Sequence, residues 1–238
     1  GKKMAAIYGA ENVYDFSLGN PSLEPPAAVK EAVLKVLEET SPNELHGYPS
    51  NGGFEDVRLA IAQQQNRLHG TNYNEENIIM TVGAAAGLNI ILKAILNPGD
   101  EVIVFAPFFG EYASYVANYD GVLVTVSPDI QTFQPNMDEL EQKITKNTKA
   151  LIINTPNNPT GVIYSEETLK TLSEILTKKE KEIGHPIYLI SDEPYRELFY
   201  GDFKIPFVPD FYPNTIIAYS FSKSLSLPGE RIGYVTIH

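Results

Sequence analysis

From residue 78 to the end of the chain, short apolar runs rich in β-branched residues alternate with stretches of helical periodicity. Such alternation is typical of βαβ units and of a mainly parallel sheet. We therefore expect an α/β fold. The strands are predicted at residues 78–82, 101–105, 122–126, 150–154, 187–191, 215–219 and 233–237, and helices at 85–96, 110–118, 137–144 and 166–182, the last with Ser165 as N-cap.

The first part of the chain has a different pattern. Residues 15–26 are rich in turn formers, and Pro25 and Pro26 precede apolar residues spaced as in an amphipathic helix. Residues 41–53 are expected to form a loop, and the spacing from Phe54 to Leu68 predicts a helix that ends near Gly70. We divide the chain into an N-terminal arm with a small-domain segment, residues 1–45, and a large domain, residues 46–238.

Charge and composition exclude several classes of function. The formal net charge of -12 disfavours a nucleic-acid partner or an anionic membrane surface, both of which need a basic face. Cysteine is absent, so thiolate catalysis and cysteine-ligated metals are excluded, and the four histidines show no metal-ligand spacing, so we expect no metal site. With no apolar run of membrane-spanning length, a cytoplasmic location is expected.

A lysine follows the sixth predicted strand. Lys223 stands just past its end, between Ser220 and Ser222 on one side and Arg231 on the other. Ligands of open α/β sheets bind outside the carboxyl ends of strands, where an amine can attack a carbonyl carbon. Hydroxyl donors and a planar guanidinium would suit an aldehyde that carries a phosphate. For this stretch alone, a solvated loop is the more common explanation.

Other strand ends carry residues that suit a planar, phosphorylated ligand. Ala84 and Ala85 follow Gly83 at the expected start of a helix, where free backbone N–H groups can receive a phosphate, although a tight turn explains them equally well. Phe109 could stack on a ring, or belong to the core. Asn158 lies in an Asn-Pro turn whose amides can donate to a ligand oxygen.

An acid and a tyrosine follow the fifth predicted strand. Asp192 could hold a ring nitrogen protonated, and Tyr195 could donate to a phenolate oxygen. The simpler explanation for Asp192 is a helix cap.

Taken in order, three motifs resemble those of class I/II aminotransferases, the pyridoxal-phosphate enzymes of the aspartate aminotransferase type (fold type I). They are Asn158-Pro159-Thr160-Gly161, Asp192-Glu193-Pro194-Tyr195, and Ser220-Phe221-Ser222-Lys223 with Arg231. The resemblance extends from about Tyr14 to Tyr234. It implies a three-layer α/β/α large domain whose seven-stranded sheet is mostly parallel with an antiparallel last strand.

The resemblance also implies a role for each matching residue. Lys223 would carry pyridoxal 5′-phosphate covalently and move the substrate proton, Asp192 would pair with the ring nitrogen, and Tyr195 with Asn158 would contact the ring's phenolic oxygen. Lys223, Asp192 and Tyr195 would thus be the catalytic residues. Phe109 would stack on the ring, and the phosphate would be held by Ala84, Ala85, Ser220, Ser222 and Arg231.

Two further positions concern the substrate and a neighbouring subunit. Gly19, in a GNP string, resembles the substrate-facing loop of the family, and Tyr48, in GYPSNGG, resembles a tyrosine lent to a neighbouring subunit's phosphate. A homodimer is therefore expected. The family pattern also continues after residue 238 into a lobe whose arginine holds the substrate carboxylate, so the chain is expected to be truncated.

The expected function is transfer of an amino group between an amino acid and a 2-oxo acid. A pyridoxal-dependent carbon–sulfur β-lyase uses the same first steps and stays open as an alternative. A non-catalytic cofactor-binding module of a transcriptional regulator is the alternative from another class, although the chain shows no helix-turn-helix or basic stretch.

Overall fold

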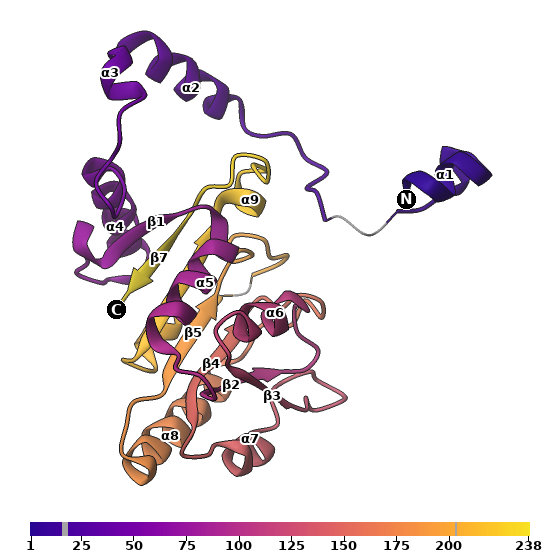
Figure 1. The fold of residues 1–238 in the computed structure, drawn as a ribbon, viewed down its shortest axis with the longest axis vertical. Helices are drawn as coiled ribbons and strands as arrows, with labels where there is room; N and C mark the ends of the chain where they lie inside the picture. Colours follow the sequence, from indigo (N-terminus) through magenta and orange to yellow (C-terminus); the bar gives the residue numbers. More distant parts are fainter. Residues whose placement is uncertain (16–18, 203) are drawn as a thin grey trace.

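The computed structural model describes residues 1–15, 19–202 and 204–238. Seven strands form one sheet in the order β1-β7-β6-β5-β4-β2-β3 (Figure 1). All seven predicted strands are present, with ends that shift by at most two residues. Their bounds are β1 Ile78–Thr81, β2 Glu101–Phe105, β3 Val122–Val126, β4 Thr148–Asn154, β5 Tyr188–Asp192, β6 Thr215–Ser220 and β7 Gly233–Ile237.

Strand β7 runs in the opposite direction to the other six strands of the sheet. The pairs β2–β3, β2–β4, β4–β5 and β5–β6 are parallel, whereas β7 is antiparallel to both β6 and β1. The β6–β7 pairing places Tyr219 opposite Tyr234 and Ser220 opposite Gly233. The expected seven-stranded, mostly parallel sheet with an antiparallel last strand is confirmed.

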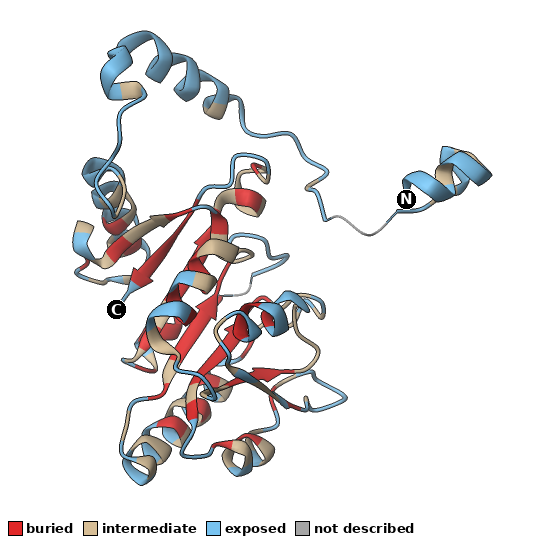
Figure 2. Cartoon of the chain, in the orientation of Figure 1, coloured by how far each residue is buried: buried red, intermediate tan, exposed pale blue. Residues whose placement is uncertain are grey.

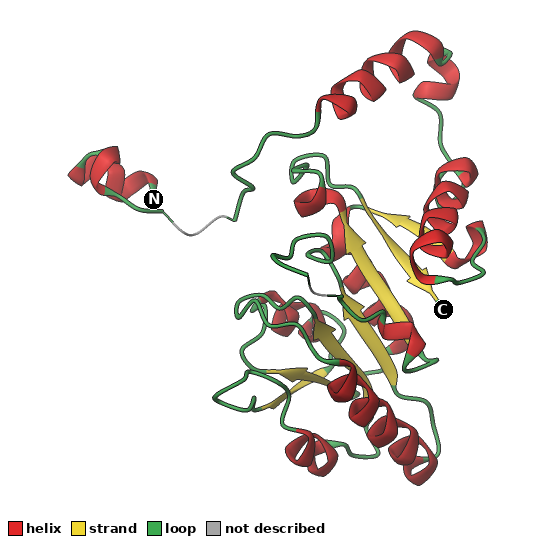
Figure 3. Cartoon of the chain, turned by 180° about the vertical axis from the view of Figure 1, so that it is seen from behind, coloured by secondary structure: helices red, strands yellow, loops and turns green. Residues whose placement is uncertain are grey.

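Helices cover both faces of this sheet, which gives the expected three layers (Figures 1 and 3). On one face, α5 (Gly83–Ile95) and α6 (Glu111–Ala117) pack on alternate strand residues such as Val104 and Ile152. On the other face, α7 (Met137–Lys143) and α8 (Glu166–Ile183) pack on Ile103 and Ile153. The side-chain period of two along each strand divides the core in this way. Ser165 caps α8 as predicted.

Helix α4 (Glu55–His69) extends the second face over the β7 side of the sheet, with Ala62 packed near Ile217, Tyr219 and Tyr234. It ends at Gly70, as predicted, in the left-handed conformation that glycine adopts readily. Because Tyr219 and Ser220 are successive strand residues, Ser220 points to the α5 face and Tyr219 to the α4 face.

The N-terminal helices lie apart from the sheet and have no buried residues (Figure 2). Helix α2 (Ala27–Glu39) follows Pro26, as predicted. Three helices were missed: α1 (Lys2–Tyr8), α3 (Pro42–Leu45) and α9 (Phe221–Ser224). Helix α3 corrects the loop expected at 41–53, because Ser41 caps a single turn there. The short 3₁₀ segments are η1 (Ala10–Asn12), η2 (Glu75–Asn77) and η3 (Val208–Asp210). Of the loop expected at 15–26, residues 16–18 lie outside the described residues.

None of the helices in the described ranges is both long and apolar enough to cross a bilayer.

Candidate active site

The carboxyl ends of β4, β5 and β6 meet on the α5 face of the sheet, where they border a cavity of about 190 Å³. Parallel strands deliver their last residues to the same edge, so residues far apart in sequence converge there. Ten of the residues singled out from the sequence line this one cavity: Ala84, Ala85, Phe109, Asn158, Asp192, Tyr195, Ser220, Ser222, Lys223 and Arg231.

Asp192 is the last residue of β5 and is almost completely buried. Its Oδ2 accepts a hydrogen bond of 2.6 Å from the hydroxyl of Tyr112, and its Oδ1 is buried with no hydrogen-bond partner. Burial raises the pKa of Asp192 to about 7; the Tyr112 hydrogen bond lowers this pKa and the nearby Glu193 carboxylate raises it. An unpaired buried acceptor is costly, and a cationic N–H donor would satisfy it.

Asn158 and Tyr195 form the polar wall next to Asp192. The Asn158 amide donates to the hydroxyl of Tyr195 at 3.3 Å, and the backbone N–H of Asn158 donates to Oδ1 of Asn154 at 2.6 Å. Asn154 in turn donates to the backbone carbonyl of Asp192 at 2.8 Å. Burial raises the pKa of Tyr195, and the Asp192 carboxylate raises it further. The two loops that follow β4 and β5 are thereby fixed to each other.

Lys223 lies on α9 (Phe221–Ser224), a single turn that begins directly after β6. Ser220 caps this turn: its hydroxyl oxygen accepts from the backbone N–H of Ser222 at 3.1 Å, and its hydroxyl donates to that of Ser222 at 2.8 Å. The ammonium of Lys223 donates to the backbone carbonyl of Gly19. The N-terminal arm thus brings Gly19 into contact with the lysine.

Arg231 and the start of α5 form the cationic end of the cavity. Gly83, at the first position of α5, has a φ of 74°, and a Cβ there would come within 2.9 Å of Nη2 of Arg231. The guanidinium therefore lies against the helix terminus, whose free N–H groups and dipole favour an anion. Ala84 and Ala85 add no side-chain donors, so any phosphate would depend on the backbone, Arg231 and the two serines.

Other residues of the site were missed by sequence reasoning. Tyr112, Tyr115 and Asn154 contact or line the cavity, and Leu88, Pro194 and Pro228 complete its wall. Asn154 had a usable signal, since it ends a predicted strand. Tyr112 had none, because it looks like any core residue of an amphipathic helix. Tyr48 is fully exposed and does not line the cavity.

Comparison with known proteins shows the family of the chain. The family model described as aminotransferase class I and II matches residues 11–238. The chain belongs to the class I and II aminotransferases. An aspartate aminotransferase of Pyrococcus horikoshii is 36% identical over 231 residues, which cover 94% of this chain and 56% of the relative. A probable aspartate/prephenate aminotransferase of Aquifex aeolicus is 34% identical over 229 residues, with 94% and 56% covered.

Solved aminotransferases share the fold. An amino transferase from Eubacterium rectale superimposes with a TM-score of 0.96 at 50% identity, over 100% of this chain and 60% of the other. The aspartate aminotransferase of Thermotoga maritima gives a TM-score of 0.87 at 32% identity, over 99% and 61%. The chain therefore spans just over half the length of the aminotransferases that it matches.

The family implies pyridoxal 5′-phosphate, and the cavity beside Lys223 has groups that fit it. The unpaired Oδ1 of Asp192 suits a protonated ring nitrogen, Phe109 offers an aromatic face, and Lys223 offers an amine for the aldehyde. Arg231 and the α5 terminus suit the phosphate.

Proposed function

We propose that the protein transfers an amino group between an amino acid and a 2-oxo acid, with pyridoxal 5′-phosphate as cofactor. The observation that carries this proposal is the convergence of Lys223, the half-paired Asp192 and the cationic end at Arg231 in one cavity. When bound, the cofactor supplies an aldehyde that condenses with amines and a ring that withdraws electrons from the substrate α-carbon.

Lys223 would hold the cofactor and then act as the base that takes the proton from the substrate α-carbon. An amine suits both tasks, because it is a nucleophile toward carbonyl carbon and a proton carrier once displaced. It lies on the first turn after β6 and next to Ser222, its ammonium contacts Gly19, and it lines the same cavity as the cationic end and the polar wall.

Asp192 would keep the ring nitrogen protonated. A cation next to a buried carboxylate lowers its pKa, so Asp192, whose pKa is about 7 without a cationic partner, would be ionised beside a protonated ring nitrogen. Tyr195 and Asn158 would donate to the phenolic oxygen of the ring from the polar wall, where they already contact each other.

Arg231, the N–H groups of α5, Ser220 and Ser222 would bind the phosphate. Ala84 and Ala85 would contribute through their backbone only, and Tyr48 of a second copy would complete the site, which makes a homodimer the proposed active unit. These contacts anchor and orient the cofactor, and orientation of the reacting bonds accounts for a large part of the rate of such reactions.

Aspartate is the first amino donor to test. The relatives from Pyrococcus horikoshii and Thermotoga maritima are named aspartate aminotransferases, and others are named aspartate/prephenate aminotransferases. An alanine aminotransferase from Pyrococcus furiosus has the same fold at 30% identity, so alanine belongs in the panel as well.

The proposal is tested by reconstituting the protein with pyridoxal phosphate, reducing it with borohydride and mapping the modified peptide. A pyridoxyl group on Lys223, absent from Lys223→Ala, is the expected result, and a label on another lysine would overturn the assignment. Keto-acid release from each amino donor with 2-oxoglutarate then measures transfer. Pyruvate and ammonia from cystathionine without any 2-oxo acid would show β-elimination instead.

A further inference from the structure

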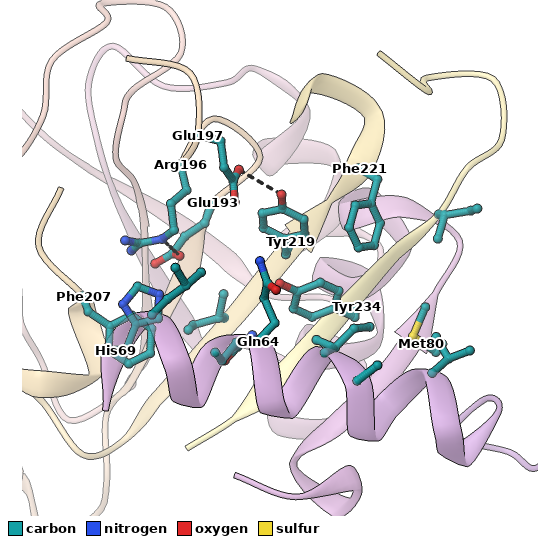
Figure 4. Close-up of a pocket in the computed structure, with 17 residues that line it drawn as sticks. Gln64, His69, Met80, Glu193, Arg196, Glu197, Phe207, Tyr219, Phe221 and Tyr234 are labelled. Carbon is teal, nitrogen blue, oxygen red and sulfur yellow. Dashed lines mark hydrogen bonds and ion pairs between the residues drawn. The ribbon is translucent and has the colours of Figure 1, made fainter. Parts of the chain in front are cut away.

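A second cavity has a volume of about 400 Å³ (Figure 4). It lies on the α4 face of the sheet, opposite the α5 face that borders the cavity of Lys223. Helix α4 forms one side, and side chains of β6 and β7 form the floor. Most of its lining is apolar, but Tyr219 presents a hydroxyl there and is 5% exposed. Its ring stacks on Tyr234 at 4.8 Å between centroids and meets Phe221 edge-on at 5.2 Å, which fixes the direction of the hydroxyl.

The hydroxyl of Tyr219 contacts two segments that carry site residues. It lies 2.9 Å from Oε2 of Glu197, two residues after Tyr195, and 2.8 Å from Oγ of Ser224, the residue after Lys223. A carboxylate can only accept, so the single phenolic proton goes to Glu197, and Ser224 donates to the phenolic oxygen. The result is a directed chain from Ser224 through Tyr219 to Glu197.

We propose that Tyr219 is a positioning residue that holds Lys223 and Tyr195 in register from behind the sheet, through Ser224 and Glu197. The inference rests on the proposed function for its consequence in catalysis. Helix α9 is a single turn, too short to be rigid alone, so a hydrogen bond at its last residue restrains the lysine before it. Glu193 and Arg196, which line the second cavity, form an ion pair at 2.5 Å. The turn after β5 thus directs Asp192 and Tyr195 into the cavity of Lys223, while its other side chains hold it from the opposite face.

The first test needs no cofactor. Hydrogen exchange measured by mass spectrometry compares wild type, Tyr219→Phe and the control Tyr234→Phe. The control removes a phenolic oxygen from the same cavity that forms no hydrogen bond with Ser224 or Glu197 in the described structure. Tyr219→Phe should speed exchange severalfold in peptides around both 193–198 and 221–226, and Tyr234→Phe in neither. Unchanged exchange in either peptide, or equal effects of both variants, would overturn the proposal.

The second test reads out the lysine itself. Reductive methylation of the cofactor-free protein should modify Lys223 at a rate that changes in Tyr219→Phe but not in Tyr234→Phe. With pyridoxal phosphate, the dissociation constant should rise about tenfold in Tyr219→Phe, the effect of about one net hydrogen bond. Equal dissociation constants for both variants would contradict the positioning role.

Two further variants keep the inference falsifiable if Tyr219→Phe does not fold. Ser224→Ala removes the hydrogen-bond donor at a partly exposed position and should speed hydrogen exchange only in the peptide that contains Lys223. Glu197→Gln should speed exchange more in the peptide that contains Tyr195. The reverse pattern would overturn the chain of donors. If wild type takes no cofactor at Lys223, the proposed function fails, while the exchange data still decide whether Tyr219 links the two segments.

Discussion

Tyr112 donates a hydrogen bond of 2.6 Å to Oδ2 of Asp192, while Oδ1 of the same carboxylate is buried without a hydrogen-bond partner. The hydroxyl stabilises the ionised form, and the free oxygen is left for a ligand.

Removing this hydroxyl in Tyr112→Phe should raise the pKa of Asp192 further above about 7, by about one to two pH units for a bond to a charged group. Pyridoxal phosphate should then bind more weakly at pH 7 and recover as the pH rises. Carboxyl NMR titration of the cofactor-free protein measures the pKa. Tyr212→Phe, which loses a buried hydroxyl bonded to the Ile187 carbonyl, is the control and should leave this pKa unchanged.

The raised pKa of Asp192 should also lower stability at neutral pH. In the unfolded chain the group ionises near 3.8 and in the folded chain near 7, so between these values the folded state binds more protons. Stability therefore falls as the pH rises through this window, by up to about 4 kcal/mol. Relative to wild type, Asp192→Asn should gain free energy of unfolding between pH 4 and pH 7 in urea titrations without cofactor.

Asp129 supplies a control of opposite sign for that measurement. Hydrogen bonds from Thr132 and Gln131 lower its pKa, so its contribution to stability is present at neutral pH and lost as the pH falls through the lowered pKa. Asp129→Asn should therefore cost stability at pH 7. If both asparagine variants shift stability in the same direction with pH, the assignment for Asp192 is wrong.

Gly83→Ala should weaken binding of the phosphate group. Its Cβ would meet Arg231 at 2.9 Å, and the left-handed φ of 74° adds strain. Gly184→Ala is the matched control, with a φ of 83° and no atom within 4 Å of its Cβ. The dissociation constant of pyridoxal phosphate, measured by fluorescence, should rise only in Gly83→Ala. Equal dissociation constants for Gly83→Ala and Gly184→Ala would show that Arg231 does not bind the phosphate.

Arg196 should matter for stability rather than for holding a substrate carboxylate. Its guanidinium is paired with Glu193, which is 2% exposed, and faces the second cavity. Arg196→Met should cost about 3–5 kcal/mol, because it leaves a buried carboxylate unpaired. Lys170→Met, at an exposed pair of 3.9 Å with Glu166, should cost less than about 1 kcal/mol in the same urea titration. A large rise in KM without loss of stability in Arg196→Met would contradict this.

Tyr48, which is fully exposed, should act in the site of a second copy. Tyr48→Phe and Lys223→Ala would then each impair both sites of a homodimer, but a mixed dimer would contain one intact site. Each mixed dimer should thus recover about half of the cofactor binding and transfer of a wild-type dimer, which is about a quarter of wild type for a random 1:1 mixture of the two variants. Failure of the mixture to recover, once mass spectrometry shows mixed dimers, would exclude an exchanged tyrosine.

Much of this geometry could be predicted because a parallel sheet gathers its strand ends. Asn158, Asp192 and Lys223 follow strands that the apolar pattern reveals. A parallel sheet alone therefore predicts that these three residues lie close together. The bond from Tyr112 could not be foreseen, since it links a helix interior to a strand 80 residues away and depends on side-chain direction. Helix α3 was missed because a single capped turn has too few residues to show a period.

The hairpin of β6 and β7 has a consequence for how the chain can vary. Gly233 lies opposite Ser220, and a Cβ on it would come within 2.4 Å of the Tyr219 carbonyl oxygen and 2.8 Å of the Gly83 backbone. A side chain at this position is therefore excluded, which locks one strand against the other. A slip by one residue would exchange the faces of successive side chains. Gly233 thus fixes the register that keeps Tyr219 beside Tyr234 on one face and Ser220 on the other, so this position is expected to tolerate no other residue.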